Sequence, residues 1–303
     1  MVCEGYYLEL FDKSIWVVKG CCHEESRVAA MPRLVGGRKY KDYRSSYNVV
    51  RNSYGHYLSK PLFTAREIPM VPVSDIKAVI PPYRMPRCYD NTALSTAARE
   101  IIEILEKHVG GEWMITGSLL YCAVDERSDI DVISYSAGPE HLKRLESLIG
   151  EGVFRKPTLR EAIAEAQEDL EGMGLRTRVL QIMRSMSSLY YKDYRVTIKI
   201  VRCDRKEILG ICSEKHASKR YTAILEIEDS SEGSLFPYIY IVRIARAYSG
   251  DIYEGERLIA YSHRGRYASI EEGSSLACTG IIEEGLNGEK YINLDQGFCS
   301  FWE

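Results

Sequence analysis

The sequence predicts a multi-domain α+β protein, with a mixed sheet and helices at its centre, a β-rich segment before it and a small β-barrel after it. Three observations support this prediction. The 303 residues are too many for one small domain and suit two or three. Helix and strand patterns alternate from residue 89 to residue 212, whereas short apolar runs and turn signals dominate on both sides. We therefore expect domains at 1–88, 89–212 and 213–303.

The first segment contains short apolar runs and is rich in positive charge. Ser14–Val18 is one such run, and turn signals such as Gly36-Gly37 separate the runs. Residues 1–89 contain 14 Lys and Arg against 8 Asp and Glu, so their net charge is +6 while the whole chain has −3. We expect a small, basic, β-rich domain.

Within residues 27–66, nine basic residues stand against one acid, Asp42, and tyrosines lie between them. Cations that neutralise phosphates, together with rings that stack on bases, are the components of a nucleic-acid surface. A Tyr-rich fold with a solvated basic face fits the same pattern equally well. The residues expected to bind RNA or DNA are Arg38, Lys39, Lys41 and Arg44.

The central segment combines both periodicities. Apolar residues recur at helical spacing from Asn91 to His108, and Gly110-Gly111 ends that helix. A capping box at Thr158–Glu161 starts another helix, because Thr and Glu there each satisfy a free backbone N–H. The remaining expected elements are strands at Trp113–Ile115, Asp131–Tyr135 and Tyr194–Val201, and helices at Leu142–Ile149 and Leu175–Ser188.

The C-terminal segment again favours strands. Strand candidates include Ala223–Leu225, Tyr238–Val242 and Leu258–Ala260, and Asn287-Gly288 is a hairpin signal. About five short strands in so short a segment are typical of a small barrel, for which the OB fold is one candidate.

Composition excludes several classes of protein. The net charge of −3 does not suit a uniformly basic, histone-like binder, and acids such as Glu4 and Glu9 interrupt any signal-like N-terminal run. No eighteen-residue apolar stretch occurs, so we expect no membrane span and a cytoplasmic protein. The nine cysteines lack metal-finger spacing. Scarce amides and abundant charges are typical of a thermophile, in which an intracellular disulfide can form.

One stretch carries residues suited to chemistry. Residues 114–120 and 128–132 read Met-Ile-Thr-Gly-Ser-Leu-Leu and Ser-Asp-Ile-Asp-Val. Gly117 allows a sharp turn and close approach of a ligand, and Ser118 is then expected to open a helix whose free N–H groups suit a phosphate. Asp129 and Asp131 are two apart on the next strand, so both carboxylates lie on one face. Such a pair needs a cation, and its oxygen ligands suit Mg²⁺, or Mn²⁺, together with a triphosphate.

This stretch resembles the nucleotidyltransferase superfamily that includes DNA polymerase β, poly(A) polymerases and CCA-adding enzymes. The signature is Gly-Ser, a spacer, and then Asp-hydrophobic-Asp-hydrophobic, which here is Gly117-Ser118 and Asp129–Val132. More loosely, most of the chain resembles an uncharacterised archaeal family of predicted nucleotidyltransferases. The residues that carry the looser resemblance are Trp16–Gly20, Arg27–Ala30, Gly37–Tyr40, Ile115–Leu120 and Tyr261–Tyr267.

The chain departs from the superfamily at one position. The resemblance implies a third carboxylate on a later strand, but the candidate strand, residues 195–201, has no acid, and Lys199 stands where an Asp is expected. Asp193 and Asp204 flank that strand and are substitutes for the missing acid. Without a third acid the site holds metal weakly, uses one metal or is inactive, and Lys199 could instead hold a phosphate.

The resemblance implies a metal-dependent enzyme that moves a nucleoside monophosphate from an NTP to an acceptor hydroxyl. Asp129 and Asp131 are the expected catalytic and metal-binding residues, and Thr116, Gly117, Ser118 and Lys199 are the expected nucleotide-binding residues. The acceptor stays open between RNA, DNA, a protein and a small molecule. The alternative is a nucleotide- or nucleic-acid-binding protein of the same fold that has lost catalysis.

Overall fold

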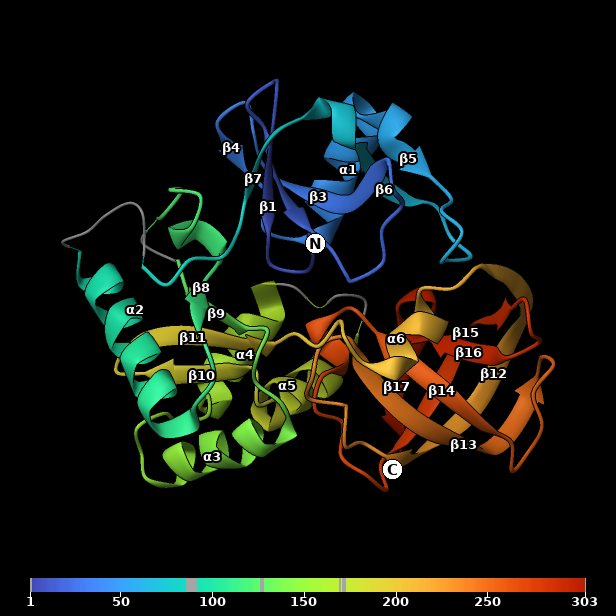
Figure 1. Cartoon of the computed structure of the whole chain (residues 1–303). Helices are drawn as coiled ribbons and strands as arrows, with labels where there is room; N and C mark the ends of the chain where they lie inside the picture. The colour runs from blue at the N-terminus through green and yellow to red at the C-terminus, as the bar shows by residue number, and fades with distance from the viewer. Residues whose placement is uncertain (1, 86–91, 126–127, 169, 171–172, 303) are drawn as a thin grey trace. The chain divides into compact units, whose positions relative to one another are not determined.

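A computed structural model of the chain describes residues 2–85, 92–125, 128–168, 170 and 173–302. The chain forms two compact units, each built from three stretches of sequence. The first unit comprises Met1–Pro61, Glu67–Arg155 and Leu189–Cys203, and the second comprises Leu62–Arg66, Lys156–Ser188 and Asp204–Glu303. The mixture of helices and several separate sheets confirms a mixed α and β protein, while the boundaries expected at residues 88 and 212 stay a prediction (Figure 1).

The first unit begins with a mostly antiparallel sheet, as its alternating short apolar runs predict. The strand order is β5-β6-β3-β2-β1-β7, with β4 attached to β3, and the helix α1 (Tyr43–Ser53) packs beside β3. Trp16 is fully buried in the core of this sheet, and the rings of Tyr54 and Tyr57 meet it edge-on. The strands are β1 (Tyr7–Leu10), β2 (Ile15–Val18), β3 (Arg27–Val35), β4 (Arg38–Lys39), β5 (Leu58–Ser59), β6 (Ile68–Pro72) and β7 (Ile76–Ile80).

A second sheet of the first unit has the order β10-β11-β9-β8, and it positions the candidate site. β8 (Met114–Ile115) runs antiparallel to β9 (Ile130–Ser134), and β11 (Tyr194–Ile200) runs parallel to it. The other elements are β10 (Ser188–Tyr191), α2 (Ala93–Ile104), the π-turn η3 (Leu105–Val109) and α3 (Pro139–Gly150). The helix expected from Asn91 to His108 is therefore present as α2 and η3, although Asn91 itself lies outside the described residues.

The second unit contains a closed barrel, which confirms the small C-terminal barrel (Figure 1, orange to red). Its order is β12-β13-β14-β16-β15, and pairing of β12 with β15 closes the ring of five strands. β14 and β16 are parallel, and the other pairs are antiparallel. The strands are β12 (Lys215–Asp229), β13 (Tyr238–Ser249), β14 (Arg257–Ser262), β15 (Ser275–Gly285), β16 (Lys290–Asn293) and the added β17 (Phe298–Trp302).

Three helices accompany the barrel in this unit. α4 (Leu159–Glu168) and α5 (Leu175–Arg184) pack on each other through Ala162, Ala166, Val179 and Ile182, and α6 (Lys206–Ile211) leads into β12. The capping box is present, because the Thr158 backbone N–H donates to Glu161 at 2.8 Å and the Glu161 N–H donates to Thr158 Oγ1 at 3.3 Å. The sequence pattern had assigned α4 and α5 to the central segment, whereas both belong to the second unit.

Two disulfides fix connections within the units. Cys21–Cys203 joins the β2–β3 connection to the chain that follows β11, and Cys278–Cys299 joins β15 to β17. The longer of the two spans 182 residues, so it removes much conformational freedom from the unfolded chain. None of the described helices has the length and apolar character needed to cross a membrane.

A buried carboxylate holds the segment 62–66 against the barrel of the second unit. Glu283 on β15 has no exposed surface, and its Oε1 accepts from Thr64 Oγ1 at 3.1 Å and from the Ala65 N–H at 2.9 Å. Tyr261 Oη donates to its other oxygen. Removal of the carboxylate would leave all of these donors without their acceptor. Each buried donor left without a partner costs free energy.

Replacement of Glu283 by Ala should therefore lower the free energy of unfolding by at least about 3 kcal/mol, since several buried donors lose their acceptor together. Urea denaturation monitored by circular dichroism measures the change. The matched control is Glu284→Ala, one residue further along β15 and partly exposed. An equal, small effect of both replacements would show that Glu283 does not hold the segment.

Candidate active site

The bend after β8 forms as the Gly-Ser pair predicts, but it is shorter than expected. Gly117 has φ of +67°, a conformation that glycine adopts without strain. The residues Gly117–Leu119 form a single 3₁₀ turn, closed by the Leu120 N–H donating to the Gly117 carbonyl at 3.0 Å. Ser118 was expected to open a helix. The turn does not continue as one, so a phosphate here would meet the N–H groups of one turn and no helix macrodipole.

The carboxylate of Asp131 lies directly against this bend. A Cβ atom placed on Gly117 would lie 2.7 Å from Asp131 Cγ and closer still to Oδ2. The Thr116 N–H also donates to the Asp131 carbonyl at 3.0 Å, which fixes the start of the bend to β9. The absence of a side chain at Gly117 is therefore what allows the acid and the bend to share one small space.

Asp129 lies at the start of β9 and faces the neighbouring strand β11. Its Oδ2 forms an ion pair with Arg195 Nη2 at 2.9 Å, and both side chains are about a quarter exposed, 27% and 29%. The register pairs Thr197 with Asp131. Alternation along β11 then places Arg195, Thr197 and Lys199 on the face that bears the acids, while Val196 and Ile198 enter the core.

The two carboxylates disturb each other. Burial, followed by the charge of Asp129, raises the pKa of Asp131 to about 7, and the cations Lys199, Arg195 and Arg33 oppose this rise. Burial and the charges of Asp131, Asp125 and Asp129 likewise raise the pKa of Tyr121 to about 12 against the effect of Arg33. The negative charge of Asp129 beside Asp131 is the kind of repulsion that a divalent cation would relieve.

The hydroxyl groups on the two sides of Gly117 have different surroundings. Ser118 is 7% exposed, and its buried Oγ has no hydrogen-bond partner among the residues that the structure describes. Buried hydroxyl groups normally have a partner, so this hydroxyl is one that could serve a ligand at the bend. Thr116 was expected to bind nucleotide, but its Oγ1 donates to the Gly5 carbonyl at 2.6 Å and so ties the bend to the N-terminal segment.

Lys199, also expected to bind nucleotide, is held by a buried carboxylate that the sequence pattern did not reveal. Lys199 Nζ lies 2.7 Å from Glu4 Oε1, and Lys19 Nζ lies 3.3 Å from the same atom. Glu4 is 1% exposed, and its other oxygen accepts from the Gly20 N–H at 2.9 Å. Although burial by itself raises the pKa of Glu4, the charges of Lys19 and Lys199 lower it to about 2. Glu4 is thus an anion placed beside the face of β11 that bears Lys199.

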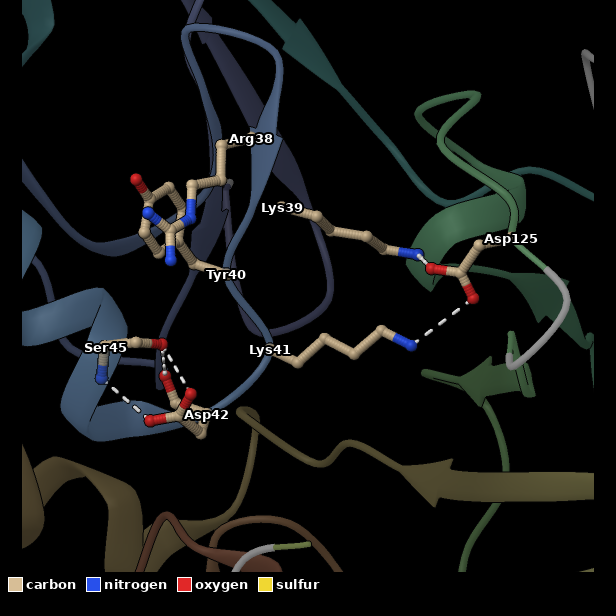
Figure 2. Close-up of a pocket in the computed structure, with 7 residues that line it drawn as sticks. All are labelled: Arg38, Lys39, Tyr40, Lys41, Asp42, Ser45 and Asp125. Carbon is tan, nitrogen blue, oxygen red and sulfur yellow. Dashed lines mark hydrogen bonds and ion pairs between the residues drawn. The ribbon is translucent and has the colours of Figure 1, made fainter.

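The basic residues after β3 line a hollow of about 650 Å³ (Figure 2). Arg38, Lys39 and Lys41 belong to its lining, whereas Arg44 lies on α1 outside it. Lys39 Nζ donates to Asp125 Oδ2 at 2.9 Å and to the Ala123 carbonyl at 2.7 Å. The hollow therefore adjoins the loop that joins the Gly-Ser bend to Asp129. Its full lining is Arg38, Lys39, Tyr40, Lys41, Asp42, Ser45 and Asp125.

The donor set suits a hard cation and a polyphosphate. Asp129 and Asp131 supply carboxylate oxygens, the Asp131 carboxylate lies against Gly117, and Ser118 Oγ has no hydrogen-bond partner among the described residues. Among the residues that the structure describes, no group of three or more His, Cys, Asp or Glu side chains could hold a metal ion. Asp193 is exposed in the turn before β11, and Asp204 belongs to the second unit. A cation here would take its remaining ligands from water and phosphate.

Comparisons with protein-family models, with curated proteins and with solved structures give no match for this chain. A functional proposal therefore depends on the residues themselves. Two groups carry it, namely the acid pair with the Gly-Ser bend and the basic hollow beside the loop that joins them.

Replacement of Gly117 by Ala should destabilise the first unit more than the same replacement at Gly152. Both glycines have positive φ, +67° and +78°, but an added Cβ meets Asp131 at Gly117 and meets nothing within 4 Å at Gly152. The backbone term, about 1 kcal/mol, is common to both, and the displacement of Asp131 adds to it only at Gly117. Thermal unfolding of the two variants measures the difference, and equal losses would show that Asp131 does not occupy the bend.

The ion pairs of Glu4 with Lys19 and Lys199 should contribute to the decrease of the free energy of unfolding at acid pH. Because the pKa of Glu4 is lower in the folded chain than its ordinary value of 4.5, ionised Glu4 stabilises the fold above that pH, and this contribution is lost as the pH falls toward 2. Glu4→Gln should flatten the pH dependence of unfolding across that interval and cost about 3 kcal/mol at neutral pH. Urea titrations at a series of pH values, with the exposed Glu25→Gln as control, test this. A wild-type acid limb in the Glu4 variant would contradict it.

Proposed function

We propose that the chain is a metal-dependent nucleotidyltransferase, similar to the DNA-polymerase-β-like superfamily, that transfers a nucleoside monophosphate from an NTP to an acceptor hydroxyl. The observation that carries the proposal is the contact between the Asp131 carboxylate and Gly117, which brings the acid pair and the Gly-Ser bend together. The unpartnered Ser118 hydroxyl at the same bend supports it.

In this reaction the acceptor hydroxyl loses its proton to water and its oxygen forms a bond to the α-phosphorus. The bond from that phosphorus to the oxygen that bridges the α- and β-phosphates breaks, and pyrophosphate leaves with the electron pair. Gly117 admits the triphosphate to the bend, and Ser118 donates its hydroxyl to a phosphate oxygen. Asp129 and Asp131 would hold Mg²⁺ or Mn²⁺, which polarises the phosphate and neutralises charge when bound. Positioning and charge neutralisation supply most of the rate enhancement.

The strand β11 makes the site differ from a three-carboxylate site. Its face toward the acids bears Arg195, Thr197 and Lys199 in place of an acid. Arg195 is already paired with Asp129, so a cation must compete with its guanidinium for that carboxylate. We therefore expect weak binding of a single metal ion, with Arg195 turning to the triphosphate as Asp129 ligates the metal. Lys199 acts on phosphate as a point charge whose position Glu4 sets.

The contact between Asp131 and Gly117 also fits a second candidate, a nucleotide- or nucleic-acid-binding protein that has lost catalysis. The barrel supports binding in either case. Its strand order, with the first strand pairing both the second and the fourth and with the third and fifth parallel, is the connectivity of an OB fold, a fold used to bind single-stranded nucleic acids. Fold alone does not determine function, so turnover must decide between the two candidates.

Asp129→Asn combined with Asp131→Asn should abolish Mg²⁺-dependent release of pyrophosphate from NTPs, because the cation loses both carboxylates. A screen of radiolabelled NTPs against tRNA, oligonucleotides and lysate protein measures transfer, and Ser118→Ala should reduce it by about tenfold with the fold intact.

Glu25→Gln, which removes an exposed carboxyl from the β2–β3 connection, is the control, and Asp193→Asn tests the exposed carboxyl in the turn before β11. Turnover that survives in the double variant would refute the acid pair as the catalytic site. Wild-type protein that binds ATP and Mg²⁺ without any turnover would establish the binding protein instead. Loss of turnover in Asp193→Asn would identify that residue as the third acid.

A further inference from the structure

The positive charges of Lys39 and Lys41 in the basic hollow of the first unit are neutralised by the Asp125 carboxylate, which belongs to the lining of the hollow. Figure 2 shows Lys39 and Lys41 extending from the chain after β3 to Asp125, which lies on the loop between the Gly-Ser bend and Asp129. The two Nζ atoms lie 2.9 Å and 3.4 Å from the two oxygens of Asp125. The carboxylate thus occupies the position between two ammonium groups that a phosphate would take.

The other acid of the hollow is used differently. Asp42 caps α1, since its side chain accepts from the Ser45 N–H at 2.8 Å and also from the Ser45 hydroxyl. It therefore stabilises the start of the helix and is not paired with the lysines. If Asp125 withdraws, the hollow presents Arg38, Lys39 and Lys41 against this one capping acid, which is a net positive site.

Aromatic rings at the hollow separate binding residues from structural ones. Arg38 lies over the Tyr40 ring, 5.4 Å from its centre, and Tyr43, 39% exposed, stacks on Tyr47. By contrast Tyr54 and Tyr57 pack on Trp16 and belong to the core. The rings that lie beside the cations are thus distinct from those that pack on Trp16. Rings beside a phosphate site suit unstacked bases, which a single strand offers and a duplex does not.

We propose that the hollow binds a backbone phosphate of a single-stranded nucleic acid, which takes the place of Asp125 between Lys39 and Lys41. We further identify this strand as the acceptor of the transfer. That identification rests on the proposed function, whereas strand binding itself does not require it.

Binding at the hollow is connected to the acid pair by one short loop. Lys39 Nζ also contacts Ser128 Oγ at 3.4 Å, and Ser128 precedes Asp129 directly. Ser128 in turn accepts from the Asp125 N–H at 2.9 Å. A phosphate that displaces Asp125 therefore changes the contacts that hold the residue next to a catalytic carboxylate. The strand end would lie one loop away from the triphosphate at Gly117.

The test measures binding of fluorescently labelled single-stranded RNA and DNA of about ten nucleotides by anisotropy, without NTP or Mg²⁺, at several salt concentrations. Arg38→Gln with Lys41→Gln should raise Kd by about tenfold and reduce the slope of log K against log salt by about 0.7, which is one phosphate contact on a single strand. Asp125→Asn should instead lower Kd by about threefold and steepen the slope, because the strand no longer competes with a carboxylate.

Controls with the same change of charge lie outside the hollow. Arg51→Gln with Lys60→Gln, two exposed cations, and Glu25→Gln, in the β2–β3 connection, should each leave the affinity within about twofold of wild type. Equal effects of hollow and control variants would overturn the proposal, as would absence of binding at low salt. RNA that binds and DNA that does not would still support it and would add recognition of the 2′-hydroxyl.

The same proteins separate this inference from the proposed function. Asp129→Asn with Asp131→Asn should bind the strand as wild type does but lose ATP binding in the presence of Mg²⁺. If strand binding depends on the hollow and no transfer occurs, the proposed function fails and the nucleic-acid site stands. If Arg38→Gln with Lys41→Gln weakens ATP binding and leaves strand binding unchanged, the hollow serves the triphosphate and the inference is wrong.

Discussion

The close approach of the Asp131 carboxylate to the backbone of Gly117 is the constraint on which the candidate site depends. A β-carbon at that position would overlap the carboxyl group, so the bend and the acid can coexist only with glycine. The positive φ of Gly117 is a second reason for the same residue. Because β8 and β9 are hydrogen-bonded neighbours, the bend that ends one strand is held beside the acid that begins the other. Backbone pairing thus sets the distance between the Gly-Ser bend and the acid pair.

Electrostatics then sets how the site behaves without a ligand. Two carboxylates in a partly buried place repel each other, and the chain compensates with Arg195 on Asp129 and with Lys199 and Arg33 farther away. Lys199 is itself held by Glu4, which belongs to the N-terminal segment. The N-terminal sheet therefore completes the surroundings of the acid pair, and the hollow after β3 does so from another direction through Lys39 and Asp125. Both contacts connect the two sheets of the first unit.

The basic segment shows why composition alone leaves alternatives open. Its tyrosines divide between a core role at Trp16 and a position beside the cations of the hollow, and nucleic-acid binding stays a prediction. The same division holds for the candidate nucleotide-binding residues. Gly117 and Ser118 lie at the bend itself, whereas the Thr116 hydroxyl and the Lys199 ammonium group also contact the N-terminal segment.

The sequence by itself determined the local features, because short-range rules govern them. Period-two alternation placed Asp129 and Asp131 on one face, the capping box began α4, and Asn287-Gly288 marked the hairpin between β15 and β16. The prediction that a helix begins at Ser118 was wrong. The chain there forms one 3₁₀ turn, after which Leu119 and Leu120 are buried in the core. Only the tertiary structure decided that Glu4 meets Lys199 and that Lys39 meets Asp125, because those partners are 195 and 86 residues apart and no local pattern relates them.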